Sequence, residues 1–156
     1  MEPAKTIEEP AAARPPPSLE LQPHVELSDA AQAKKILIAE DNVVNQRLLL
    51  RILSCFGLTS VDIAVNGKEG VDMVKAAPSA YSLILMDTSM PIMSGLEATK
   101  LIREMGIDVP IIALTAHAMK GDRELFLTRG FNGYLSKPMR KPDVGVVLLK
   151  WLDGES

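Results

Sequence analysis

Short, wholly apolar runs separate longer stretches in which apolar and polar residues recur at helical spacing. The clearest run is Leu83–Met86, which leads directly into the carboxylate of Asp87. An uninterrupted apolar run of this length is typical of a strand buried on both faces of a parallel sheet. A second run, Ile36–Ala39, ends in the same way, in Glu40 and Asp41. The pattern therefore predicts two buried strands that deliver three carboxylates to one edge of a sheet.

The alternation of strand-like and helix-like stretches continues to the end of the chain. We expect strands at Lys35–Ala39, Ser60–Ala64, Leu83–Asp87, Val109–Leu114 and Gly133–Ser136. We expect helices at Val43–Phe56, from Asn66 to before Pro78, from Ser94 to Gly106, at Met119–Thr128, and from Pro142 onward. Asn42, Asn66 and Ser94 are residue types that cap helix starts. Five such units with short connections predict an α/β fold with a five-stranded parallel sheet in the order 2-1-3-4-5.

Residues 1–34 differ in composition from the rest. They hold six of the 11 prolines, and their six acidic and three basic residues account for the whole net charge of −3. Such a stretch buries too little apolar surface to offset the entropy of ordering. We therefore expect a disordered Pro/Ala/Glu-rich tail or linker at 1–34 and a folded domain at 35–156. Leu19, Leu21, Val25 and Leu27 leave a short docked segment as an alternative.

Composition excludes several classes of function. The small negative charge argues against a nucleic-acid partner. No apolar run approaches the ~18 residues of a membrane span, and the start lacks the features of a signal peptide. The single Cys55 excludes an internal disulfide and suits a reducing compartment. We expect a cytoplasmic protein, or the cytoplasmic part of a membrane-bound sensor, without direct membrane insertion.

The predicted sheet order places the first and third strands side by side, at the point where ligands bind in open α/β sheets. Glu40, Asp41 and Asp87 would then converge, with Thr115 and Lys137 beside them at the ends of strands four and five. Converging buried carboxylates are costly unless a cation meets them. Mg²⁺ prefers oxygen ligands and shares its coordination shell with phosphate. The edge therefore favours a magnesium-dependent phosphoryl site.

Each of these residues has an ordinary explanation when it is taken alone. A strand-end aspartate is usually a turn or cap former, and a lone lysine is usually a solvated charge. Their joint placement at one edge of the sheet favours a functional acidic site over these ordinary roles. Asp87 would be a nucleophile that forms an acyl phosphate, while Lys137 and Thr115 would bind two oxygens of the phosphoryl group.

The folded part contains the motifs Ala39-Glu40-Asp41-Asn42, Leu85-Met86-Asp87, Met90-Pro91, Gly95, Ala113-Leu114-Thr115-Ala116 and Tyr134-Leu135-Ser136-Lys137-Pro138. With these motifs it resembles the receiver domain of two-component signalling. The stretches Asn42-Val43-Val44-Asn45-Gln46 and Leu114-Thr115-Ala116-His117-Ala118-Met119 look most like receivers attached to hybrid histidine kinases. The resemblance implies the flavodoxin-like (βα)₅ fold. It also implies a switch, not a turnover enzyme, whose partner is a histidine kinase or a histidine phosphotransfer protein.

Residue roles follow from the same resemblance. The phosphoacceptor would be Asp87, the magnesium ligands Asp41, Asp87 and the Ser89 carbonyl, the outer acid Glu40, and the switch residues Thr115 and Tyr134, with Lys137 at the phosphoryl group. The Lys137–Pro138 peptide bond would be cis. The signal would leave through the fourth helix, the fifth strand and the last helix, around Met119–Leu125 and Tyr134–Leu148.

Two departures and one competing family bear on this interpretation. Ser94 stands where such receivers often have Asp, and Lys141 is a poorer helix cap than the usual Asp or Ser. A haloacid-dehalogenase-type phosphatase also uses a strand-end aspartate with Mg²⁺ and is the alternative function. That family needs a second aspartate two residues later, where this chain has Ser89. Whether the chain is free-standing or part of a larger kinase stays open.

Overall fold

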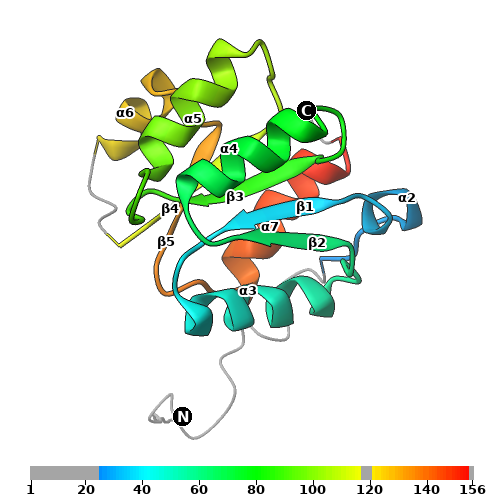
Figure 1. The fold of residues 1–156 in the computed structure, drawn as a ribbon. Helices are drawn as coiled ribbons and strands as arrows, with labels where there is room; N and C mark the ends of the chain where they lie inside the picture. The colour runs from blue at the N-terminus through cyan, green and yellow to red at the C-terminus, as the bar shows by residue number, and fades with distance from the viewer. Residues whose placement is uncertain (1–24, 117–120, 155–156) are drawn as a thin grey trace, which may run out of the picture.

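The architecture is a five-stranded parallel sheet covered by helices on both faces (Figure 1). The computed structural model describes residues 25–116 and 121–154. The strands are β1 (Ile36–Ala39), β2 (Val61–Ala64), β3 (Leu83–Asp87), β4 (Ile111–Thr115) and β5 (Gly133–Ser136). Their order is β2-β1-β3-β4-β5, with every neighbouring pair parallel. The predicted fold class and strand order are confirmed.

The described helices are α2 (Asp29–Gln32), α3 (Val43–Cys55), α4 (Gly67–Ala76), α5 (Gly95–Glu104), α6 (Asp122–Thr128) and α7 (Lys141–Leu152). Three of them, α3, α4 and α5, begin directly after the caps that the sequence predicts, whereas α2 lies in the predicted tail. The side chains of Asn42, Asn66 and Ser94 each accept a hydrogen bond from an N–H in the first turn of the helix that follows. Helix α6 begins at Asp122, and the predicted start at Met119 lies outside the described residues. Within the described ranges, no helix is both long and apolar enough to cross a membrane.

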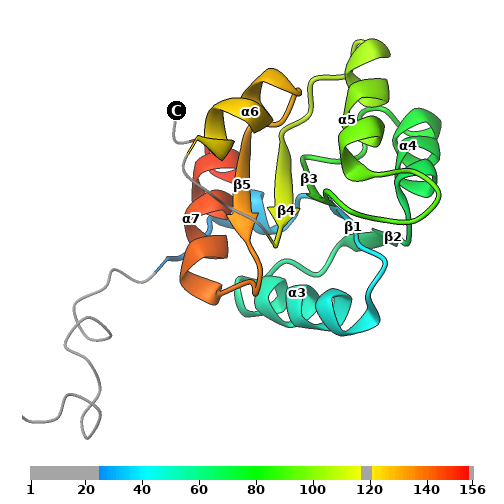
Figure 2. The same cartoon turned by 90° about the vertical axis from the view of Figure 1, so that its left-hand side faces the viewer.

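Alternate residues of each central strand enter two separate cores. Ile36 and Ile38 pack with α3 and α7, whereas Leu37 and Ala39 pack with α4, α5 and α6 on the other face. The two views show these helix layers on either side of the sheet (Figures 1 and 2). All residues of β1, β3 and β4 are buried. This double burial explains why these strands lack polar alternation and end abruptly at polar residues.

The folded domain begins before residue 35. Residues Val25–Lys34, here called the N-terminal strap, lie against the α3–α7 face. Leu27 and Ala31 are buried in the α3–α7 core, and Val25 packs against it. The prediction that the disordered tail reaches residue 34 is therefore wrong for residues 25–34. The alternative, a docked segment, describes Val25 and Leu27; Leu19 and Leu21 lie outside the described residues.

Polar contacts fix the strap to the end of α7. The backbone N–H of Ser28 donates to Asp153 Oδ2 at 3.0 Å, and its hydroxyl donates to Oδ1 at 2.5 Å. These hydrogen bonds lower the pKa of Asp153 below its usual value. Lys34 Nζ donates to the carbonyl of Leu152 at 2.6 Å, which satisfies a carbonyl in the last turn of α7. The strap thereby orders the carboxyl end of that helix.

Candidate functional site

Three carboxylates meet at the carboxyl edge of the sheet. Asp87 is the last residue of β3, and Glu40 and Asp41 directly follow β1, whose Ala39 pairs with Met86. One oxygen from each of the three carboxylates lies within 4.8 Å of the others. Glu40 and Asp87 are buried, whereas Asp41 is exposed. The structure brings together the three acids that the sequence predicts at this edge.

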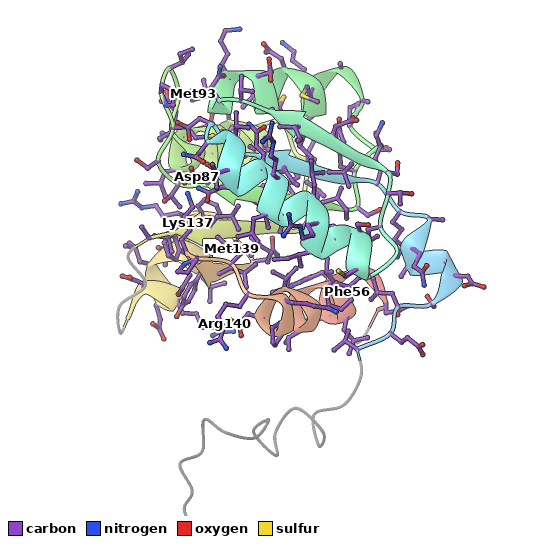
Figure 3. The ribbon with its side chains drawn as sticks, turned by 90° about the horizontal axis from the view of Figure 1, so that it is seen from below. Phe56, Asp87, Met93, Lys137, Met139 and Arg140 are labelled. Carbon is purple, nitrogen blue, oxygen red and sulfur yellow. The ribbon has the colours of Figure 1, made fainter. Side chains whose placement is uncertain are left out.

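Lys137 faces this cluster from the loop after β5. Its ammonium nitrogen lies 3.1 Å from Glu40 Oε1 and 3.1 Å from Asp87 Oδ2. Lys137 and Asp87 are labelled at the same end of the molecule in Figure 3. Burial disfavours the charged ammonium, but the hydrogen bonds and charges of Asp87 and Glu40 outweigh it and raise the pKa of Lys137. The Lys137–Pro138 peptide bond is cis, as the resemblance implies. Lys137 therefore stays protonated and cross-links the two buried acids.

Hydrogen bonds hold Glu40 in place, but they do not use both oxygens of its carboxylate. Burial raises the pKa of its carboxyl above the usual value, although the N–H of Asn42 donates to Oε2 and opposes this shift. The Gln46 amide donates to the Glu40 carbonyl at 2.7 Å. Within the described residues, the buried Oε1 contacts the Lys137 ammonium but accepts no well-directed hydrogen bond. A buried carboxylate oxygen without such a hydrogen bond, beside two more carboxylates, is suited to a hard cation and a water bound to that cation.

The remaining predicted residues surround Asp87. The N–H of Ser89 donates to Asp87 Oδ1 at 3.1 Å. Asp87 pairs with Leu114 in the sheet, so the buried Thr115 follows beside it at the end of β4. Tyr134 is half-buried, and the centroid of its ring lies 5.7 Å from the ring centroid of Phe126. The roles of the Ser89 carbonyl, Thr115 and Tyr134 stay predictions.

Two supporting contacts were not predicted from the sequence. Gln46 holds the Glu40 backbone, yet a glutamine in the first turn of a helix carries no signal for that contact. Gly67 lies so close to the carbonyl of Met93 that a Cβ there would clash with it. Gly95, which the motif did include, meets the carbonyl of Asp87 in the same way. Both glycines allow the loop after Asp87 to lie tightly against its neighbours.

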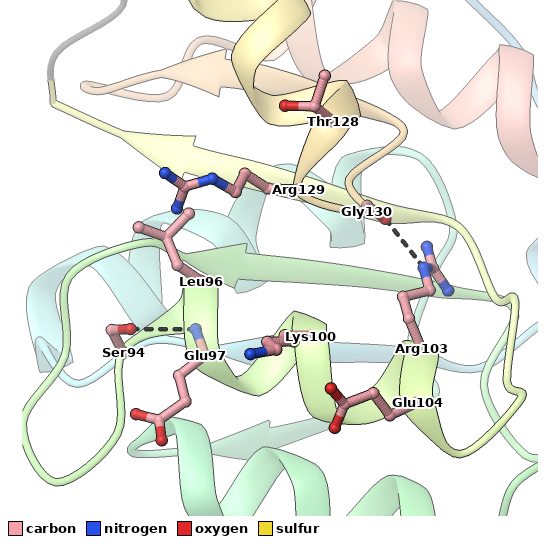
Figure 4. Close-up of a pocket in the computed structure, with 9 residues that line it drawn as sticks. All are labelled: Ser94, Leu96, Glu97, Lys100, Arg103, Glu104, Thr128, Arg129 and Gly130. Atoms are coloured by element: carbon pink, nitrogen blue, oxygen red, sulfur yellow. Dashed lines mark hydrogen bonds between the residues drawn. The ribbon is translucent and has the colours of Figure 1, made fainter.

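A groove also lies away from the acidic edge. This groove of about 880 Å³ lies between α5 and the end of α6 (Figure 4). Arg103 crosses one end of it, donating from Nε to the Gly130 carbonyl at 2.9 Å and from a terminal nitrogen to Asn132. Burial lowers the pKa of this guanidinium below its usual value. These hydrogen bonds join α5 to the segment between α6 and β5 and have a structural role. The groups suited to chemistry therefore lie in the carboxylate cluster.

Residues 36–148 match the family described as the response regulator receiver domain. The chain belongs to this family. The match covers all five strands of this receiver domain and the acidic cluster with Lys137. The resemblance inferred from the motifs is thus confirmed.

Relatives of this receiver domain include parts of much longer proteins. It is 44% identical over 126 residues to two-component system protein A of Emericella nidulans. That match covers 81% of this chain but only 18% of the relative. This receiver domain covers 6% of hybrid signal transduction histidine kinase I of Dictyostelium discoideum and 10% of the osmosensing histidine protein kinase SLN1 of Saccharomyces cerevisiae. The chain therefore spans less than a fifth of each of these relatives.

Two solved structures resemble this receiver domain in fold. The receiver domain of Ssk1 from Saccharomyces cerevisiae, crystallised with the histidine phosphotransfer protein Ypd1, has a TM-score of 0.70 and 33% identity over 77% of this chain and 89% of that one. The receiver domain of sensor histidine kinase PA1611 from Pseudomonas aeruginosa, with magnesium in its active-site cleft, has a TM-score of 0.67 and 39% identity. That match covers 77% of this chain and 98% of the other.

Proposed function

We propose that this receiver domain accepts a phosphoryl group on Asp87 from the phosphohistidine of a histidine kinase or a histidine phosphotransfer protein. The observation that carries the proposal is the Lys137 ammonium, 3.1 Å from a buried Asp87 oxygen within a cluster of three carboxylates. A carboxylate held by one lysine at a strand end is suited to nucleophilic attack on phosphorus.

The transfer step conserves atoms and charge. A carboxylate oxygen of Asp87 forms a bond to phosphorus, and the bond from phosphorus to the donor imidazole nitrogen breaks, with its electron pair remaining on that nitrogen. The N–H of Ser89 and the ammonium of Lys137, which contact the two oxygens of Asp87 before reaction, are close enough to bind oxygens of the transferred group. The Thr115 hydroxyl would bind a further oxygen.

The acidic cluster would hold Mg²⁺ through Asp41, Asp87 and the Ser89 carbonyl, with Glu40 acting through water. Bound there, the cation supplies the positive charge that lets an anionic phosphoryl group approach three carboxylates. The buried Oε1 of Glu40, beside the Lys137 ammonium, supports this assignment because a metal-bound water could donate to it. The donor set is entirely oxygen, which favours magnesium over softer metals.

The phosphorylated domain would act as a switch and not as a turnover enzyme. Thr115 would move toward the acyl phosphate, and Tyr134 would turn inward beside β4. The surface that changes is the face of α6, β5 and α7, where Leu125 and Val146 are exposed apolar residues. A phosphoryl group shifts this equilibrium only by its different affinity for the two states. The free Cys55 suits a reducing compartment, and we place this switch in the cytoplasm.

Mass spectrometry after incubation with phosphoramidate, a small phosphoryl donor, tests the proposal. Wild-type protein should gain one phosphoryl group when Mg²⁺ is present and none when EDTA removes it. Asp87→Asn should gain none, whereas the control Asp72→Asn, which alters an exposed carboxylate on α4, should react as wild type does. An undiminished adduct on Asp87→Asn would refute the assignment.

A further inference from the structure

The loop that follows Asp87 contains a rare turn. Ile92 has a φ of +72°, and the N–H of Met93 donates to the carbonyl of Pro91 at 2.7 Å. A hydrogen bond across two residues with a central residue at positive φ is a γ-turn of the strained type. Positive φ is unusual for any residue with a Cβ, and a β-branched side chain there is an outlier. Within the described residues, Ile92 is the one non-glycine residue at positive φ.

The side chain of Ile92 adds a second cost. Ile92 is 79% exposed, the highest value among the exposed large apolar residues in the described parts of the chain. Glycine or asparagine would adopt this backbone with less strain and would leave no apolar surface in water. Neither the backbone nor the packing of the free domain therefore explains an isoleucine here. Strain and exposure of this kind persist at sites of function.

The neighbouring backbone holds this turn in place. The carbonyl of Met93 accepts the N–H of Gly67 at 3.0 Å, and the N–H of Gly95 donates to the carbonyl of Thr88 at 3.2 Å. Met90 and Met93 also pack against the core on the α4–α5 side. Because both sides of the turn are fixed, Ile92 is presented to solvent from a rigid support and does not lie on a free loop.

The turn lies at the rim of the acidic site. It follows Asp87 by five residues, and Met93 and Asp87 lie at the same end of the molecule, remote from Phe56 (Figure 3). Across the site, Val43 and Val44 open helix α3 just after Asp41 and are 53% and 72% exposed. Asp87 itself is only 3% exposed. A protein that brings a phosphohistidine to Asp87 must therefore cover this rim.

We propose that Ile92 is an apolar docking contact that selects the phosphohistidine-bearing protein partner. The partner would present an apolar surface beside its histidine, and burial of Ile92 would contribute only when a protein, not a small molecule, delivers the phosphoryl group. The inference rests on the proposed function and adds a specificity-determining residue to it. It also explains why the domain keeps a strained, exposed isoleucine that lowers its own stability.

The test compares two phosphoryl donors on Ile92→Asn. Asparagine tolerates positive φ, so the turn is retained while the apolar surface is lost. The protein donor is phosphorylated Ypd1, the phosphotransfer protein crystallised with the similar Ssk1 receiver domain, and the small donor is phosphoramidate. The control is Met105→Asn, which removes an exposed apolar side chain at the opposite edge of the sheet.

We expect the second-order rate constant for phosphoryl transfer from phosphorylated Ypd1 to fall about tenfold for Ile92→Asn, which corresponds to about 1.4 kcal/mol. The rate with phosphoramidate should stay within about twofold of wild type, and the melting temperature should be unchanged or higher. Met105→Asn should match wild type with both donors.

Equal second-order rate constants for wild type and Ile92→Asn with phosphorylated Ypd1 would overturn the inference. Parallel losses with both donors would overturn it as well, because they would locate the defect in the chemistry of Asp87. Failure of the proposed function itself looks different, since phosphoramidate would then leave no phosphoryl group on Asp87 of the wild-type protein.

Discussion

Substituting methionine for Lys137 removes the ammonium between Glu40 and Asp87 while keeping most of the side-chain volume. Both contacts are 3.1 Å long. At an effective dielectric constant of about 20, each is worth about 5 kcal/mol before desolvation is subtracted. Removing one partner of a buried ion pair typically costs about 3–5 kcal/mol, because the other charge is left without compensation.

The lower end of that range applies here. The Lys137 side chain is 21% exposed, so water screens part of the interaction, whereas the Glu40 side chain is fully buried. We therefore expect Lys137→Met to lower the free energy of unfolding by about 3 kcal/mol in EDTA. Saturating Mg²⁺ should recover most of this loss, because a cation bound by the three carboxylates replaces the missing charge.

Urea unfolding followed by circular dichroism measures both quantities, with Lys100→Met as the control. Lys100 is exposed on α5 and has no ion pair within the described residues. Its substitution should change stability by less than about 0.5 kcal/mol with or without Mg²⁺. The electrostatic argument would be refuted if Lys137→Met cost no more than Lys100→Met, or if Mg²⁺ stabilised the variant less than it stabilises wild type.

Three further outcomes are expected. Leu27→Ala should lower the free energy of unfolding by about 2–4 kcal/mol in urea titrations, since Leu27 is buried in the α3–α7 core; a loss under about 0.5 kcal/mol would mean that the strap does not contribute to folding. Gly95→Ala should slow phosphorylation by phosphoramidate, because its Cβ would displace the carbonyl of Asp87, and an unchanged rate would contradict this. Thr115→Ala should still be phosphorylated but should lose much of the amide chemical-shift change at Tyr134 on adding beryllofluoride, a mimic of the phosphoryl group; equal shifts in both proteins would argue against the switch.

The sheet was predictable because its signal is local and strong. Runs such as Leu83–Met86 have no polar alternation, which requires burial on both faces, and the order of strands then follows from the handedness and length of the connections. The converging acids were predictable for the same reason, since Asp87 ends β3 and Glu40 directly follows the adjacent strand β1. Two strand starts differ from the prediction: the predicted strands include Ser60 and Val109, whereas β2 begins at Val61 and β4 begins at Ile111.

Features that depend on contacts between distant residues could not be predicted in this way. Leu27 and Ala31 belong to a core formed by helices far along the chain, and the proline-rich residues before them dominate the composition of the segment. The hydrogen bond from Gln46 to Glu40 depends on how α3 leaves β1. The positive φ of Ile92 contradicts the local preference of the residue, so sequence reasoning points away from it.

The hydrogen bonds between Ser28 and Asp153 have a consequence for how the domain can be joined to other domains. Residues 125 positions apart are in direct contact, and they lie at the edge of the sheet opposite Asp87. The chain therefore arrives and departs at one corner. A domain whose two ends lie close together can be inserted into a longer polypeptide, because joining its ends to adjacent residues of the host costs little conformational entropy. Segments joined at that corner leave the domain at the end of the sheet opposite Asp87.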